Sequence, residues 1–208
     1  MLFRSIATFA TFALSAVSVI AAPAAEANGV ALVKKATPAS IPQIFADATT
    51  SLTPQTQALQ GLGPNDLTVD KISPIVATIV TILDEVVTDV KLLVGQEASI
   101  VLATVDKTAI VALHDLAVIV SELVHLVLTA LAAVLTLLSA HPFAAAAEIH
   151  SLLFQVGQLV GTVVVTVVQV AGVLLPGLQV AISALLGDLS FIITELGLTL
   201  LGGLLGIL

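Results

Sequence analysis

The stretch SLLFQVGQLVGTVVVTVVQV, residues 151–170, decides the fold of this chain. Its second half, Thr162–Val170, is rich in β-branched residues, which by propensity alone favour a strand. The polar residues instead recur at intervals of 4, 3, 4, 4 and 3 positions, a mean of 3.6, which is the helical period. These positions are Ser151, Gln155, Gln158, Thr162, Thr166 and Gln169. The spacing therefore predicts an amphipathic helix through the whole stretch.

The same period continues on both sides of this stretch. Ser73–Pro74 has the pattern of a helix start, and Pro142 ends a helix because proline cannot continue the hydrogen-bond ladder. The four predicted helices run from about Ser73 to Gly95, from Glu97 to Ser139, over 143–175, and from Pro176–Gly177 towards the glycine-rich end. We therefore expect an all-α fold, a bundle of about four amphipathic, very hydrophobic helices over residues 70–208.

The first 69 residues differ from this helical domain. Arg4 followed by the apolar core Ser5–Ile20 predicts a signal peptide over residues 1–22. Residues 23–69 hold five of the eight prolines and many Ala, Thr and Ser residues, which predicts a disordered segment. Lys34–Lys35 is either a dibasic processing site or a solvated pair of charges.

Composition excludes several classes of protein. The chain has no cysteine, which excludes a disulfide scaffold of the hydrophobin type and any thiolate chemistry. A net charge of −8 opposes binding to nucleic acids and to anionic bilayers. The seven Phe residues, with no Trp or Tyr, offer few rings on which bases or sugars stack. We expect no cofactor.

No combination of polar residues indicates catalysis. Glu122-Leu-Val-His125 has the Glu-x-x-His spacing of di-iron bundles, but such a site needs a second copy, which the chain lacks. Glu148 and His150 have the wrong spacing for one helical face, and His114–Asp115 has no nucleophile in a recognisable motif nearby. We therefore expect a non-enzymatic protein without catalytic, cofactor-binding or metal-binding residues.

The C-terminal half is more apolar than a bundle requires. After Lys107 the chain contains no Lys or Arg, and the last two predicted helices are polar over a narrow stripe only. Folding alone should then leave apolar surface exposed, which a lipid, a partner, a second copy or an interface must cover. Gly157 and Gly161 allow close helix contact, either within the bundle or between copies.

A membrane location is the alternative. Residues 151–175 are long enough to span a bilayer, and 177–208 is a second candidate span. Basic flanks and an aromatic belt, which normally fix a span, are absent. The apolar tail Leu196–Leu208 also allows a GPI signal, although no clear polar spacer precedes it. A lipid-carrying bundle is a third reading.

The layout resembles a family of secreted, cysteine-free structural proteins from the walls and aerial hyphae of mushroom-forming fungi. The similarity lies in the leader ending VIAAPA, the Pro/Thr-rich segment, and the helical block opening VDKISPIVATIVTIL at residues 69–83. It implies a secreted protein of the cell wall or extracellular matrix that supports aerial growth and attachment. We expect it to act by self-association and by adsorption at hydrophobic–hydrophilic interfaces.

Overall fold

Helices, connecting turns and one isolated bridge, from Ala103 to Ile110, make up the described part of the chain, residues 39–140 and 145–206 of a computed structural model. The all-α class is thereby confirmed for these residues. The predicted leader 1–22, the Lys34–Lys35 pair and His141–Pro142 lie outside them.

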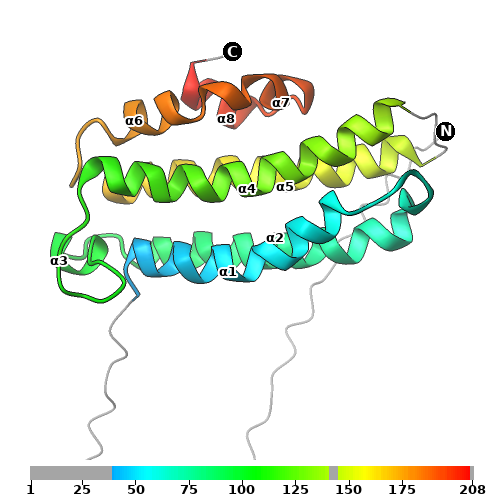
Figure 1. Cartoon of the computed structure of the whole chain (residues 1–208). Helices are drawn as coiled ribbons and strands as arrows, with labels where there is room; N and C mark the ends of the chain where they lie inside the picture. The colour runs from blue at the N-terminus through cyan, green and yellow to red at the C-terminus, as the bar shows by residue number, and fades with distance from the viewer. Residues whose placement is uncertain (1–38, 141–144, 207–208) are drawn as a thin grey trace, which may run out of the picture. The chain divides into compact units, whose positions relative to one another are not determined.

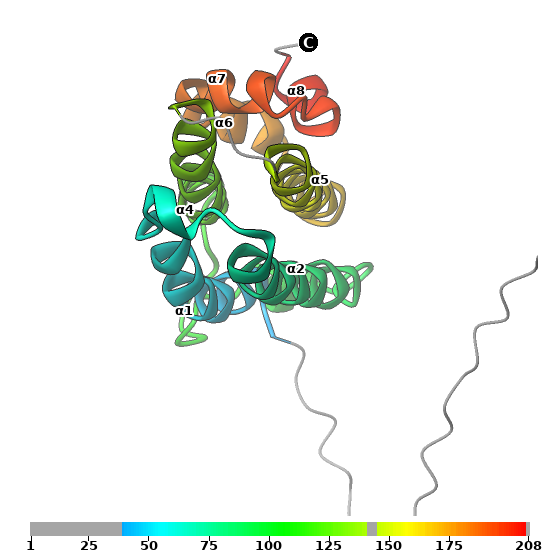
Figure 2. The same ribbon diagram turned by 90° about the vertical axis from the view of Figure 1, so that its right-hand side faces the viewer.

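The helices form three layers (Figure 1, Figure 2). The first layer is α1 (Ile41–Gln60) and α2 (Val69–Lys91), the middle layer is α4 (Leu113–Ala140) and α5 (Ala146–Ala171), and the third layer is α6 (Leu178–Leu185), α7 (Ser190–Glu195) and α8 (Thr199–Leu205). The short α3 (Ala98–Val101) lies between α2 and α4, and two 3₁₀ turns cover Pro64–Asp66 and Gly187–Leu189. Contacts join α1 to α4 and α2 to α5 on one side, and α4 to α6 and α5 to α8 on the other. The eight α-helices of the described residues replace the four that the sequence predicts.

The first layer buries one stripe of side chains on each helix. In α2 the stripe is Ile72, Val76, Ile79, Leu83, Val86 and Val90, at alternating intervals of 4 and 3. Between these positions the helix exposes its polar side chains, among them Asp84, Glu85 and Asp89. Such a single stripe is typical of an amphipathic helix that covers one side of a core.

The middle layer buries two stripes on each helix. In α4 one stripe is Leu116, Val120, Leu123, Val127, Ala130 and Val134, and the other is Ala117, Ser121, Val124, Leu128, Leu131 and Leu135. In α5 the stripes are Ile149, Leu153, Val156, Val160, Val163 and Val167, and Gly157, Gly161, Val164 and Ala171. The second stripe is the apolar surplus of the sequence. The third layer covers this stripe, so the apolar side chains that stay exposed in the last two predicted helices are others, among them Val173, Val180 and Phe191.

Helix α1 corrects the prediction of a disordered segment over 23–69 for residues 41–60, whereas residues 23–38 lie outside the described part of the chain. Ser40 caps its start, with Oγ accepting a hydrogen bond from the backbone N–H of Gln43, and Pro42 stands where proline is tolerated. Its buried stripe packs against α4 and α2 and includes Phe45 and Leu52. Pro54 lies inside the helix but on its exposed side. The composition predicts disorder, but burial of one apolar stripe against neighbouring helices stabilises α1.

The sequence also places the start of α2 too far along the chain. The helix begins at Val69 rather than at Ser73–Pro74, so Pro74 lies within it. Pro74 offers no N–H to the carbonyl of Asp70, but Asp70 is an exposed residue, so water can reach this carbonyl.

The predicted helix from Glu97 to Ser139 is interrupted by a loop. Asp106 accepts hydrogen bonds from Thr104 Oγ1 at 2.6 Å and from the backbone N–H of Thr108 at 3.2 Å. These two bonds hold the pKa of the Asp106 carboxyl below its ordinary value. Lys107 adopts φ 60°, which a helix does not allow. Short polar side chains that bind nearby backbone therefore divide this segment into α3 and α4.

The predicted fourth helix is likewise broken. Pro176 and Gly177 lie in a turn, as predicted, and α6 begins directly after it, at Leu178. The chain then bends at Leu186, before the 3₁₀ turn Gly187–Leu189, and turns again at Gly197, which has φ +64°. Three short helices result, and their buried residues still form an apolar stripe that faces the middle layer.

We expect Leu52→Ala to lower the free energy of unfolding by about 2–5 kcal/mol, because Leu52 is fully buried in α1. Gln57→Ala, at an exposed position of the same helix, should change it by less than about 0.5 kcal/mol. Urea titration of the two variants measures both values. Equal, small effects would mean that α1 does not pack against the core.

Candidate functional site

The candidate site is a covered surface. We call α6–α8 the C-terminal cover, and the sides of α4 and α5 beneath it the covered face. Together, α4 and α5 are the two described helices that are long and apolar enough to cross a membrane, and they lie between α1–α2 and the cover. The bent pair of α6 with the segment Gly187–Glu195 is a third candidate only if it counts as one span. The predicted helix over 177–208 is not continuous in its described part, where it is divided into α6, α7 and α8.

Two glycines bring the cover close to α5. A Cβ on Gly157 would lie 2.6 Å from Cδ2 of Leu198, so only a residue without a side chain fits there unless Leu198 moves. A Cβ on Gly161 would lie 3.5 Å from Cβ of Leu200, an ordinary contact. Gly157 and Gly161 thus serve helix packing within the chain, which is one of the two roles expected for them.

Two side chains hold the C-terminal cover through polar contacts, one to α4 and one within the cover itself. Nε2 of His125 lies 3.2 Å from the carbonyl oxygen of Leu185 and 3.4 Å from Oδ1 of Asp188. Nε2 of Gln179 donates to the carbonyl oxygen of Leu204 at 3.0 Å, which joins α6 to α8. The sequence indicated only a solvated stripe for His125. Its role was missed because Leu185 is 60 positions away in the chain.

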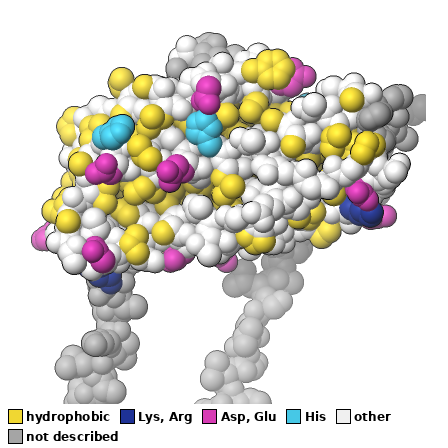
Figure 3. All heavy atoms as spheres, viewed as in Figure 1, with side chains coloured by type: hydrophobic (Ala, Val, Ile, Leu, Met, Phe, Trp, Pro, Cys, Tyr) yellow, Lys and Arg dark blue, Asp and Glu magenta, His cyan; other side chains and the backbone are white. Residues whose placement is uncertain are grey.

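The outer side of the cover exposes large apolar side chains. Val180 and Phe191 are 73% and 74% exposed, and Val173, just before the cover, is 82% exposed. In Figure 3 the Lys side chains visible on this face lie at the level of the first layer and the α3 end, whereas the upper layer shows apolar, acidic and uncharged groups. The outer side of the cover thus combines exposed apolar side chains with the acidic Asp188 and Glu195.

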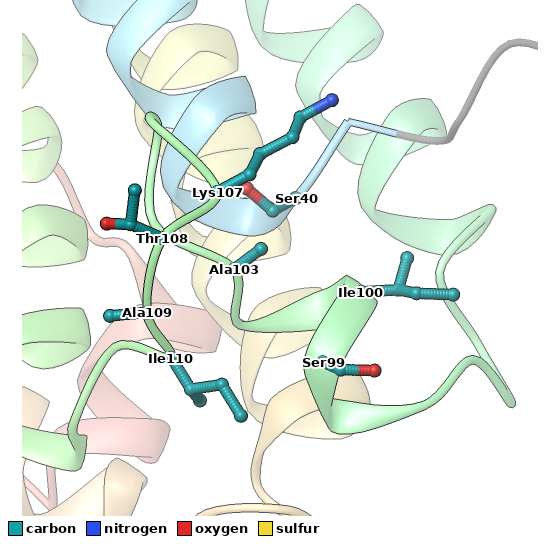
Figure 4. A pocket seen from close by; sticks show the side chains of 8 residues that line it. All are labelled: Ser40, Ser99, Ile100, Ala103, Lys107, Thr108, Ala109 and Ile110. Carbon is teal, nitrogen blue, oxygen red and sulfur yellow. The ribbon is translucent and has the colours of Figure 1, made fainter.

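A small hollow lies at the α3 end of the molecule (Figure 4). It has a volume of about 250 Å³, and Figure 4 shows that the start of α1, α3 and the 103–110 loop supply its walls. The lining residues are Ser40, Ser99, Ile100, Ala103, Lys107, Thr108, Ala109 and Ile110. They include neither a carboxylate nor a histidine, and Lys107 is the one ionisable side chain among them.

The other polar candidates are dispersed. His114, Asp115, Glu122, Glu148 and His150 are all exposed. Among the described residues no three His, Asp or Glu side chains are placed to hold a metal ion. Asp84, Glu85 and Asp89 form an exposed acidic face on α2.

Comparison of the chain with protein-family models, with curated proteins and with solved structures finds no match. Function is therefore inferred from the residues of this chain and their arrangement.

We expect Gly157→Leu to loosen the C-terminal cover, because its side chain would overlap Leu198. The loss in unfolding free energy should be about 1–3 kcal/mol, measured by urea titration. Adding Leu198→Ala should restore part of it, because the second change makes room for the first. Gly203→Ala is the control, since nothing lies within 4 Å of a Cβ at that position. An absence of coupling between positions 157 and 198 would contradict this contact.

Proposed function

We propose that this chain is a secreted, non-enzymatic, surface-active structural protein of a cell wall or extracellular matrix. It acts by adsorbing at hydrophobic–hydrophilic interfaces and by self-association, in keeping with roles in aerial growth and attachment. One observation carries the proposal: the second apolar stripe of α4 and α5 is held under a cover of short helices. Burying this stripe in water keeps the protein folded, and uncovering it supplies surface activity.

The cover is the layer best suited to detach. Its helices have 8, 6 and 7 residues, and isolated helices of that length are unstable in water. They are held by apolar packing and by the anchor at His125, which is partly exposed. At an air or oil surface the covered face meets an apolar phase instead of the cover. The polar sides of α1 and α2 remain in water.

Charge favours an uncharged apolar phase as the partner. The three Lys residues of the described part, Lys71, Lys91 and Lys107, lie on α2 and on the loop before α4. The covered face and the cover carry no Lys or Arg, so they cannot attract anionic phospholipid headgroups. Nucleic acid is excluded for the same reason.

The alternative, an integral membrane protein, is favoured by the length of α4 and α5. The layered fold opposes it. Asp84 lies beside Gln158 and Thr162, near the middle of α5, so a bilayer crossed by α5 in this fold would enclose Asp84 and its neighbour Glu85. Each charge at the bilayer centre costs about 2.5–3.5 kcal/mol on insertion scales. The third alternative is a lipid carrier. The hollow of about 240 Å³ between α4 and α7 is below the roughly 300 Å³ of ordinary ligand pockets, and the larger hollows, of about 440 and 380 Å³, both include the charged Asp84 in their lining.

A disulfide across the cover tests the proposal. In the double variant Gly161→Cys with Leu200→Cys, the Cβ atoms stand about 3.5 Å apart, within the range of natural disulfides. The chain has no other cysteine, so oxidation forms only this bond within the molecule. A bond worth about 2–4 kcal/mol should reduce the opened population about thirtyfold or more. We expect the reduced protein to lower surface tension and the oxidised protein to do so far more slowly.

The reduced double variant is the internal control, and wild-type protein treated with oxidant is the second. Equal surface activity in the oxidised and reduced forms would show that the cover does not open. A protein that leaves surface tension unchanged and resists carbonate extraction from host membranes would replace the proposal with the membrane reading.

A further inference from the structure

The segment Thr162–Val170 adopts a helix against its own preference. Eight of its nine residues are β-branched, and the ninth is Gln169. Val and Thr lose side-chain freedom in a helix and fit better on a strand. A short segment of high β-propensity, without charge, proline or glycine, has the composition of cross-β assemblies.

Packing from both outer layers keeps this segment helical. Val163, Val164 and Val167 are at most 1% exposed within α5, which packs against α2 on one side and α8 on the other. Thr166, also buried, donates from Oγ1 to the carbonyl oxygen of Thr162 at 2.7 Å. The hydroxyl group of Thr166 and the backbone amides of the helix thus form their hydrogen bonds within α5. When α8 leaves, one of the two packing partners is lost.

Helix α2 contains a comparable run that is protected by its flanks. Ile75–Ile82 has seven β-branched residues in eight, but Pro74 precedes it and Asp84 and Glu85 follow it closely. Proline and charge at the ends of such a run oppose strand stacking. Around Thr162–Val170, by contrast, no ionisable side chain occurs between His150 and Asp188. Only the α5 run therefore lacks protection in the sequence.

We propose that the partner of the uncovered α5 is a second copy of this chain, and that copies associate by pairing Thr162–Val170 as β-strands. Self-association then includes a local change from helix to strand at this segment. The inference rests on the proposed function, because the interface is what removes the cover.

The test compares two double variants of the full mature chain with wild type at an air–water interface. Val165→Ala with Val168→Ala changes two half-buried positions of the α5 run and replaces β-branched side chains by the best helix former. Ile75→Ala with Val80→Ala makes the same kind of change in the α2 run, at positions of similar exposure. Infrared amide bands and thioflavin fluorescence report strand formation, and surface tension reports adsorption.

We expect wild type and the α2 variant to gain strand signal at the interface, and the α5 variant to adsorb equally well but to convert at least tenfold more slowly. Conversion of the α5 variant at the wild-type rate would overturn the inference, since another segment would then be responsible. A wild-type film that lowers surface tension yet stays helical would overturn the inference and leave the proposed function intact. If wild type leaves surface tension unchanged, the proposed function fails. The inference is then tested in urea at the midpoint of the unfolding transition, which uncovers the segment without an interface. Absence of strand signal in urea overturns the inference.

Discussion

The structure depends on two neighbouring helices that each bury two stripes of side chains. An amphipathic helix with one apolar stripe needs a partner on one side, but α4 and α5 need partners on both. The first layer, α1 and α2, supplies one side, and the C-terminal cover supplies the other. The three-layer arrangement follows from this requirement, as does the shape of the cover, whose short helices follow the covered face through breaks at Leu186 and Gly197.

The layers that cover the two sides of α4 and α5 are held unequally firmly. Helices α1 and α2, with 20 and 23 residues, lie along α4 and α5 and expose polar faces to water, that of α2 being charged. The cover has shorter helices, and its outer side exposes large apolar side chains, including Phe191, beside acidic ones. Removing it costs fewer intrahelical bonds, and an apolar phase compensates for the burial that is lost. The same apolar excess that stabilises the fold in water thus provides its activity at an interface.

Sequence periodicity was sufficient where one face of a helix decides its burial. The polar residues of 151–169 correctly predicted that α5 passes through Thr162–Val170, although propensity favours a strand. Sequence periodicity fails where local hydrogen bonds, or contacts between residues distant in the chain, determine the structure. Thr104 and Lys107 fit a helical stripe but belong to a loop around Asp106, and α1 was hidden by its prolines. The surplus was recognised, but its cover was not, because the packing of Gly157 against Leu198 joins residues 41 positions apart.

Native-state hydrogen exchange tests the central claim most directly, namely that a detachable cover lies on a stable four-helix core. Amides in α6–α8 should exchange through an opening that costs clearly less free energy than global unfolding, while amides in α1, α2, α4 and α5 should exchange only by unfolding as a unit. Equal opening free energies for the cover and for α4 would contradict the account, because the covered face would then be inaccessible in the folded protein.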